Sequence, residues 1–185
     1  MSLVDLISQA DDRGLAASGL ACLDRCVPLL GGDDETLRPL WGSLAEGVGD
    51  DAWGIALEQV RGKLAGSEEP ATDEPVQLAR RMLSAAPDEP FADGMRLWAD
   101  ACSVASLQIH RLLDPAEDTG SVDARREGRT DGMSPLVAAE LRRQVTVLEV
   151  LAGHGPTGLR RALEVSTEGR RVLRAVVSRR ARGLG

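Results

Sequence analysis

The chain has 185 residues, a hydrophobic fraction of 43%, a charged fraction of 28% and a net charge of −7, values that are ordinary for a soluble globular protein. The sequence has no apolar run long enough to cross a membrane and no signal-peptide pattern at its start. With only three Cys, it also lacks the composition of a disulfide framework. We therefore expect a soluble, cytoplasmic protein.

Helical spacing of apolar residues begins at the N-terminus and continues along most of the chain. Ser2 and Asp5 predict a capping box for a short first helix. A second helix is expected from about Gly14 to Val27, because Pro28 lacks a backbone donor and disfavours the helical conformation of the residue before it. No segment alternates in the way that predicts a β-strand.

Two further helices are predicted on either side of a Gly/Asp turn at 49–51, and their matched apolar sides predict an antiparallel hairpin. Acidic pairs at 11–12, 33–34 and 50–51 stand where helices should begin. Such pairs suggest helix caps or ligands for a hard metal ion, and we favour caps because adjacent carboxylates do not share a helix face. The apolar positions of the two helices are Leu37, Leu40, Trp41, Leu44, Val48, Trp53, Ala56, Leu57, Val60 and Leu64.

After a polar linker at 66–75 and a shorter helix that ends near Ala86, the segment 90–113 has the longest apolar pattern of the chain. A helix that is apolar on most sides should be surrounded by other helices. The sequence thus predicts an all-α fold, a single compact domain of seven or eight helices around a central helix 90–113. The main apolar side of this helix is expected to be Phe91, Met95, Trp98, Cys102, Ala105, Ile109 and Leu112. A second apolar face is Leu97, Ala101, Val104 and Leu107. The remaining narrow polar stripe is Asp93, Arg96, Asp100, Ser103 and His110.

Residues 114–132 are almost entirely polar or charged, so we expect a mobile loop in which nothing offsets the entropy of ordering. A loop of this length inside a compact domain is otherwise functional, for example as a lid. Ser134 and Pro135 then predict the start of a helix that ends at Gly153.

The last segment predicts a basic amphipathic helix over 156–178, followed by an Arg-rich tail over 179–185. From Arg160 onward eight Arg face only two Glu, a charge of +6, whereas the rest of the chain carries −13. Such segregation suggests that the helix either docks on its own acidic body or meets a partner. The Arg side can also be a solvated helix face, because Arg160 and Glu164, and Glu168 and Arg171, stand at helical spacing for ion pairs. The candidate partner-binding residues are Arg171, Arg174, Arg179, Arg180 and Arg182.

Residues that could carry chemistry are few, and none stands in a known catalytic, nucleotide-binding or metal-binding motif. Cys22 and Cys26 lie one helical turn apart and Cys102 lies on the expected central helix; they suggest either a soft-metal or redox site or small buried residues, and we favour burial. Neither His110 nor His154 has a nucleophile or an orienting carboxylate nearby in the sequence. We predict no catalytic, cofactor-binding or metal-binding residue and no cofactor.

The sequence favours a non-enzymatic helical protein that acts through protein–protein contacts. The partner would be another protein or a second copy of the chain, and a regulatory role is one form that this function could take. One alternative is a small-molecule binder or enzyme with a pocket between helices, for which 114–132 is the lid. A second alternative is contact with nucleic acid or an anionic membrane through the C-terminal Arg residues, although a chain of pI ≈ 4.9 is repelled by DNA as a whole. Convergent polar groups in a pocket would favour the first alternative, and an uninterrupted exposed Arg surface would favour the second.

Overall fold

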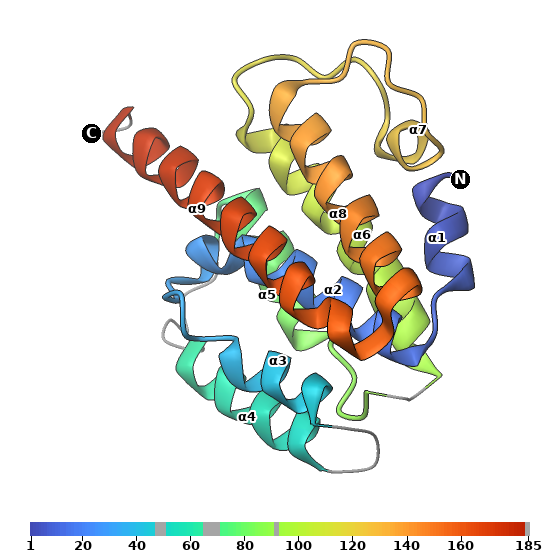
Figure 1. The fold of residues 1–185 in the computed structure, drawn as a ribbon. Coiled ribbons are helices and arrows are strands. Elements are labelled where there is room, and N and C mark those ends of the chain that lie inside the picture. Colours follow the sequence, from blue (N-terminus) through green and yellow to red (C-terminus); the bar gives the residue numbers. More distant parts are fainter. Residues whose placement is uncertain (47–50, 65–70, 91–92, 184–185) are drawn as a thin grey trace.

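The computed structural model describes residues 1–46, 51–64, 71–90 and 93–183, and within these ranges every regular element is helical (Figure 1). The prediction of an all-α compact fold is confirmed. The elements are α1 (Leu3–Gln9), α2 (Asp12–Cys26), the 3-10 turn η1 (Val27–Leu30), α3 (Arg38–Ala45), α4 (Ala52–Leu64), α5 (Glu74–Ser84), α6 (Gly94–Leu113), α7 (Val122–Arg126), α8 (Pro135–His154), the 3-10 turn η2 (Gly155–Gly158) and α9 (Leu159–Gly183).

Local signals set the boundaries of the first two helices. The predicted capping box is present at α1, where the Asp5 amide donates to Ser2 Oγ at 3.2 Å and the Ser2 amide donates to Asp5 Oδ2 at 2.9 Å. At α2, Asp11 Oδ1 accepts from the amide of Gly14 at 2.7 Å. The α-helix ends at Cys26 and a 3-10 turn containing Pro28 follows, as the missing backbone donor of Pro28 requires.

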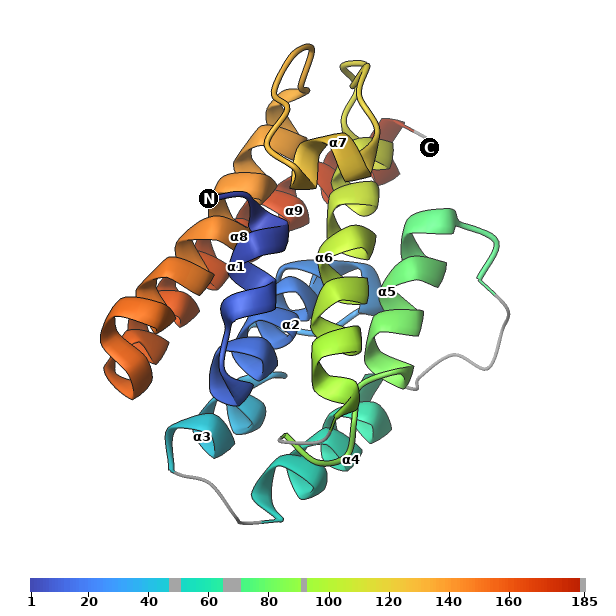
Figure 2. The same cartoon turned by 90° about the vertical axis from the view of Figure 1, so that its right-hand side faces the viewer.

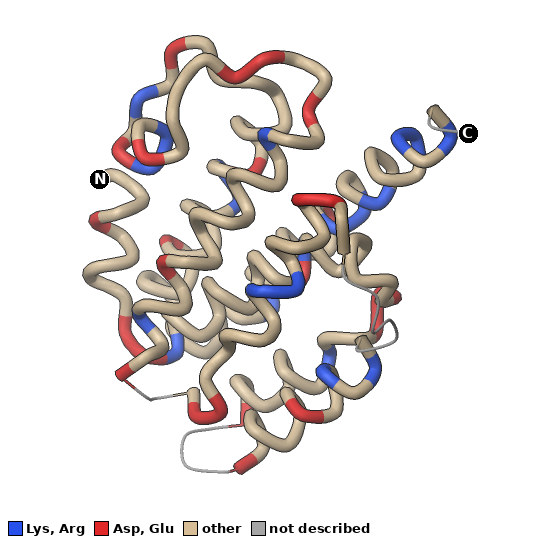
Figure 3. The backbone as a smooth tube through the Cα atoms, turned by 180° about the vertical axis from the view of Figure 1, so that it is seen from behind, with Lys and Arg blue, Asp and Glu red and all other residues tan. Residues whose placement is uncertain are grey.

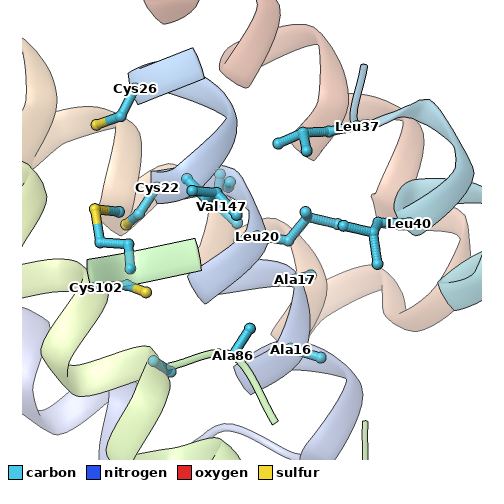
Figure 4. Packing of buried hydrophobic residues seen from close by; sticks show 14 of the residues in the cluster. Ala16, Ala17, Leu20, Cys22, Cys26, Leu37, Leu40, Ala86, Cys102 and Val147 are labelled. Carbon is cyan, nitrogen blue, oxygen red and sulfur yellow. The ribbon is translucent and has the colours of Figure 1, made fainter. Parts of the chain in front are cut away.

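Helix α2 is enclosed along almost its whole length, since every residue from Gly14 to Cys26 is buried. It packs against α6, α8 and α9, and Figure 1 shows α9 crossing in front of it. Gly19 allows α6 to approach closely, because a Cβ atom there would lie only 2.5 Å from the Trp98 ring. In the core, α2 contributes small and medium side chains that meet α6 and α8 (Figure 4). The deep burial of α2 was not anticipated from its sequence.

Helix α6 contacts α1, α2, α5, α7 and α8, but its orientation differs from the prediction. Ser103 and His110, expected on a polar outer stripe, are buried, whereas Leu97, expected on an apolar inner face, is 76% exposed. Phe91 lies outside the described residues. The rotation has a physical cause: α8 places polar side chains against Ser103 and His110, so these residues are buried with hydrogen-bond partners.

The predicted hairpin of α3 and α4 is present, with Trp41 and Trp53 both buried. The Asp pairs play different parts, however. Asp33 accepts from Thr36 Oγ1 at 2.9 Å within a turn, and α3 begins only at Arg38 without a side-chain cap. Asp34 pairs with arginines of α9 instead of capping α3. The expectation of a helix cap at 33–34 is therefore wrong, and Val48 and Asp50 lie outside the described residues.

The segment 114–132 contains α7 and buries charged side chains, so the expectation that it contains almost nothing to bury is wrong. Asp118 accepts two hydrogen bonds from the Arg125 guanidinium, at 2.8 and 3.1 Å, and one from the Ser134 amide at 2.9 Å. Arg126 reaches Ser103 on α6 at 3.2 Å. Asp118, Arg125 and Arg126 are all buried. The low apolar content of the segment misled the prediction, because polar groups satisfy one another here.

Candidate interaction surface

Helix α9 begins at Leu159, directly after the 3-10 turn η2, and remains helical to Gly183. It packs against α2, α3, α8 and η1. Its apolar side is buried as far as Val176, whereas Ser178 to Gly183 are all exposed. The last turns of α9 thus continue beyond the packed part of the helix, as Figure 1 shows at its C-terminal end. The buried apolar residues are Leu159, Ala162, Val165, Leu173 and Val176.

One arginine of α9 points into the protein, and it was not among the predicted site residues. Arg170 is buried and pairs with Asp24 of α2, and its Nε lies 3.1 Å from Asp34 Oδ1. The other oxygen of Asp24 accepts a hydrogen bond from the Trp41 indole at 2.8 Å. Burial raises the pKa of Asp24, and the neighbouring Arg170 guanidinium opposes that rise. The cluster ties α9 to α2 and α3 by buried polar contacts.

Two of the five predicted partner-binding residues are engaged within the chain. Arg174 pairs with Asp34 and donates to the carbonyl of Gly32 at 3.2 Å. Arg180 pairs with Asp73, with an Nη2–Oδ1 distance of 2.9 Å. Hydrogen bonding from Arg174, together with the charge of Arg170, lowers the pKa of Asp34. These side chains are each about 40% exposed, so solvent weakens their pairing and each contributes little to stability.

The other three predicted residues, Arg171, Arg179 and Arg182, face solvent. They are exposed, and no ion pair joins them to an acidic group among the residues that the structure describes. From Gly169 to the C-terminus the sequence contains six Arg and no Asp or Glu. Figure 3 shows the consequence, a C-terminal stretch of α9 marked by basic positions only. We call Arg171, Arg179 and Arg182 the basic end.

A second set of polar residues, which was not predicted from the sequence, lies inside the core. Arg25 of α2 donates to both carboxylate oxygens of Glu140 on α8, at 2.7 and 2.8 Å, and both side chains are fully buried. Burial alone would raise the pKa of Glu140, but the charges of Arg25 and His110 and the hydrogen bonds from Arg25 and Gln144 together outweigh burial and lower the pKa to about 2. Gly169 makes room for this pair, because a Cβ atom there would lie 2.4 Å from Arg25 Cδ.

His110 and two further side chains of α6 belong to the same network. His110 Nε2 lies 3.6 Å from Glu140 Oε2, and its Nδ1 lies 2.7 Å from the carbonyl oxygen of Ser106. Ser106 also donates to Glu140 at 2.7 Å, and Ser103 donates to Gln144 at 2.6 Å. Burial lowers the pKa of His110, which keeps the ring neutral at pH 7. A sequence signal existed, since Ser103, Ser106 and His110 share one helix face.

This network is poorly placed for catalysis. His110 and Glu140 are 1% and 0% exposed, so a substrate could reach them only if packed helices separated. A carboxylate with a pKa of about 2 is also a weak base. The contacts join α2, α6 and α8, and the arrangement serves to hold these helices in register.

The three cysteines are buried and free of disulfides, and all lie in the core contributed by α2 and α6 (Figure 4). Burial raises the pKa of Cys22 to about 12, and burial also raises the pKa values of Cys26 and Cys102. The thiolate, the reactive form, is therefore disfavoured. His154 is exposed at the end of α8. Among the described residues, no group of three or more His, Cys, Asp or Glu is arranged to hold a metal ion.

A groove of about 390 Å³ lies between α5 and α6. Its lining is apolar except for Arg81 and Gln108, and it includes the buried side chains of Met82, Trp98 and Cys102. The Trp98 indole is not available to a ligand as a donor, because it donates to the carbonyl of Met82 at 2.9 Å. The groove lacks the convergent polar groups that orient a substrate.

No protein-family model, curated protein or solved structure is significantly similar to this chain. Among the described helices, none combines the length and apolar character needed to cross a bilayer.

Proposed function

We propose that this protein is a non-enzymatic binding protein that recognises an acidic surface of another protein through the basic end of α9. The observation that carries the proposal is the division among the arginines of this helix. Arg170, Arg174 and Arg180 are paired with Asp24, Asp34 and Asp73 of the chain itself, whereas the basic end faces solvent.

The geometry of the basic end suits a protein surface. Arg171 and Arg182 are eleven residues apart on one continuous helix, a span of about 16 Å at the rise of an α-helix. Each Arg side chain presents a planar set of donors that matches a carboxylate. Because one helix already holds the three arginines in position, less conformational entropy is lost when a partner binds. An acidic partner would also approach faster, because the local charge steers it.

A protein partner is favoured over nucleic acid for two reasons. The body of the chain carries −13 and would repel a polyanion that extended beyond the basic end. No aromatic side chain lies in the sequence from Gly169 onward, so bases have nothing to stack on there. The burial of His110, Glu140 and the three cysteines supports a role other than catalysis.

The experiment is affinity capture from a lysate of the source organism at two salt concentrations, with and without nuclease, followed by mass spectrometry. The test variant is Arg179→Ala/Arg182→Ala, and the matched control is Arg160→Ala/Arg161→Ala, two exposed arginines near the start of the same helix that face Glu164. We expect a protein partner that is lost in the test variant and at high salt but kept by the control. Equal capture by both variants would contradict the proposal, and so would a nuclease-sensitive partner.

A further inference from the structure

The side of α6 that faces away from α2 carries an uncovered apolar stripe. Leu97 is 76% exposed and Leu112 is 39% exposed, while Ala101 is exposed and Val104 is half-buried. With Gln108 these residues follow one another at intervals of three or four, so they form a single line along the helix. In Figure 2, α6 lies between α1 and α5, and α7 overlaps its upper end.

The stripe lies beside the apolar groove between α5 and α6. The stripe and the groove share three residues, Ala101, Val104 and Gln108, so the exposed leucines lie next to the groove. A ridge of side chains next to a groove is the surface by which helices pack against one another. From Leu97 to Leu112 the stripe is about 22 Å long at the helical rise, which suits a helix better than a small ligand.

We infer that the occupant is a second copy of this chain, with the two α6 helices packed antiparallel about a two-fold axis. A two-fold interface must be complementary to itself. The stripe has this property: reversal about the point between Val104 and Ala105 places Leu97 on Leu112 and Ala101 on Gln108. Each exposed leucine of one copy is thereby covered by the other leucine of the second copy.

The charges beside the stripe agree with the antiparallel orientation. At 100° per residue, Asp93, Asp100 and Arg111 fall on the same side of the stripe, with the acidic residues toward the N-terminal end of α6 and Arg111 toward the C-terminal end. Asp100 pairs with Arg126 of α7 and still stays half-exposed. In antiparallel packing, Asp100 of one copy lies opposite residue 109 of the second copy, only two residues along the helix from Arg111. In a parallel two-fold pair, the charged side of one stripe would lie on the opposite side of the interface from that of the second copy, so Asp100 and Arg111 could not pair, and the helix dipoles would align rather than oppose one another.

The dimer is independent of the proposed function. Helix α9 lies behind α6, α1 and α5 in Figure 2, so pairing through α6 leaves both basic ends accessible. A dimer would then present two basic ends, and a partner with repeated acidic sites would bind it with higher avidity.

Sedimentation equilibrium of the full chain tests this inference, since one chain has a mass of 19.6 kDa. We expect a dimer for the wild type and for Ile55→Glu, the control, because Ile55 is an exposed apolar residue of α4 outside the stripe. Leu97→Glu should raise the dissociation constant about thirtyfold or more, because it places a charge where Leu97 of one copy packs on Leu112 of the second. Circular dichroism would check that the variants keep their helix content.

A cross-linking experiment fixes the orientation. Because Val104 lies next to the proposed axis, Val104→Cys should form an intermolecular disulfide under mild oxidation, whereas Ile55→Cys should not; the three native cysteines are buried. The inference is overturned if the wild type is monomeric at about 100 μM, a concentration at which a weak homodimer of μM affinity would be populated. It is also overturned if Leu97→Glu and Ile55→Glu behave alike, or if Val104→Cys does not cross-link.

Discussion

Arg25 of α2 donates to both carboxylate oxygens of Glu140 on α8, and both side chains are fully buried in the core. The preceding residue, Asp24, pairs through one carboxylate oxygen with Arg170 of α9. Two neighbouring residues of opposite charge thus connect α2 to two different helices. Because a buried charge is tolerated only with its partner, these pairs restrict how α8 and α9 can pack against α2.

Breaking the Arg25–Glu140 pair should be strongly destabilising. Glu140→Gln leaves the guanidinium buried without its counter-charge, and we expect the free energy of unfolding to fall by about 3–5 kcal/mol. The double variant Arg25→Met/Glu140→Leu removes both charges and should lose less stability than Glu140→Gln. Urea denaturation measures both variants against the wild type. A loss under about 1 kcal/mol in Glu140→Gln would mean that the pair contributes little to the packing of α2 against α8.

The buried network also predicts the pH dependence of stability. The pKa of His110 is lower in the folded protein, so the unfolded chain binds a proton that the folded protein does not once the pH falls below about 6.5. The pKa of Glu140 falls to about 2 on folding, so its contribution is present above the unfolded value of about 4.3 and is lost as the pH falls toward 2.

Stability should therefore decrease on acidification in two stages, the first starting near pH 6.5 from His110 and the second near pH 4.3 from Glu140. Denaturant titrations from pH 8 to pH 3 measure it. His110→Gln should remove much of the first stage and leave the second. An unchanged profile in this variant would show that His110 does not titrate differently in the two states.

Gly19→Ala should destabilise the protein although alanine is the better helix former. A Cβ at Gly19 would meet the buried Trp98 ring at 2.5 Å, and overpacking of this kind costs about 1–3 kcal/mol. Gly62→Ala is the matched control, since a Cβ on that exposed residue of α4 would have no neighbour within 4 Å. It should stabilise by up to about 1 kcal/mol. Thermal or urea denaturation measures both, and a stabilised Gly19→Ala would refute the close contact of α2 and α6.

Asp118 should control protease access to the segment 114–132. Trypsin must bind an arginine side chain, and Arg125 is buried against Asp118, whereas Arg129 is exposed. We expect slow cleavage at Arg125 in the wild type and at least about tenfold faster cleavage in Asp118→Ala, because local opening becomes easier. Asp123→Ala, an exposed residue of α7, should change little. Rapid cleavage of the wild type at Arg125 would instead support the mobile loop expected from composition.

Truncation after Ser178 should leave the fold intact. The removed residues up to Gly183 are exposed, and the truncation breaks the half-exposed ion pair of Arg180 with Asp73, a type of pair worth about 0–1 kcal/mol. Leu173→Asp, by contrast, buries an unpaired charge at a fully enclosed position and should cost more than about 3 kcal/mol. Circular dichroism with urea denaturation compares the two. Unfolding of the truncated chain would show that the C-terminal turns are part of the core.

Short-range features of this fold were predictable from the sequence. The capping box of Ser2 and Asp5, the end of α2 before Pro28 and the hairpin of α3 and α4 depend on neighbours along the chain or on a regular apolar spacing. Such local signals can be read without knowing which helices contact one another in the folded protein. The same spacing also predicted the apolar side of α9, with Leu173 and Val176 buried.

The burial of polar residues was decided only by tertiary structure. His110 could be buried because Glu140, thirty residues later, meets it, and Leu97 was left outside by the same rotation of α6. Arg170 and Arg171 show the limit most clearly, since they are adjacent residues of one type. Arg170 is buried because Asp24 and Asp34 converge on it, and Arg171, turned about 100° around the helix, meets no acidic group of the described chain and stays in solvent.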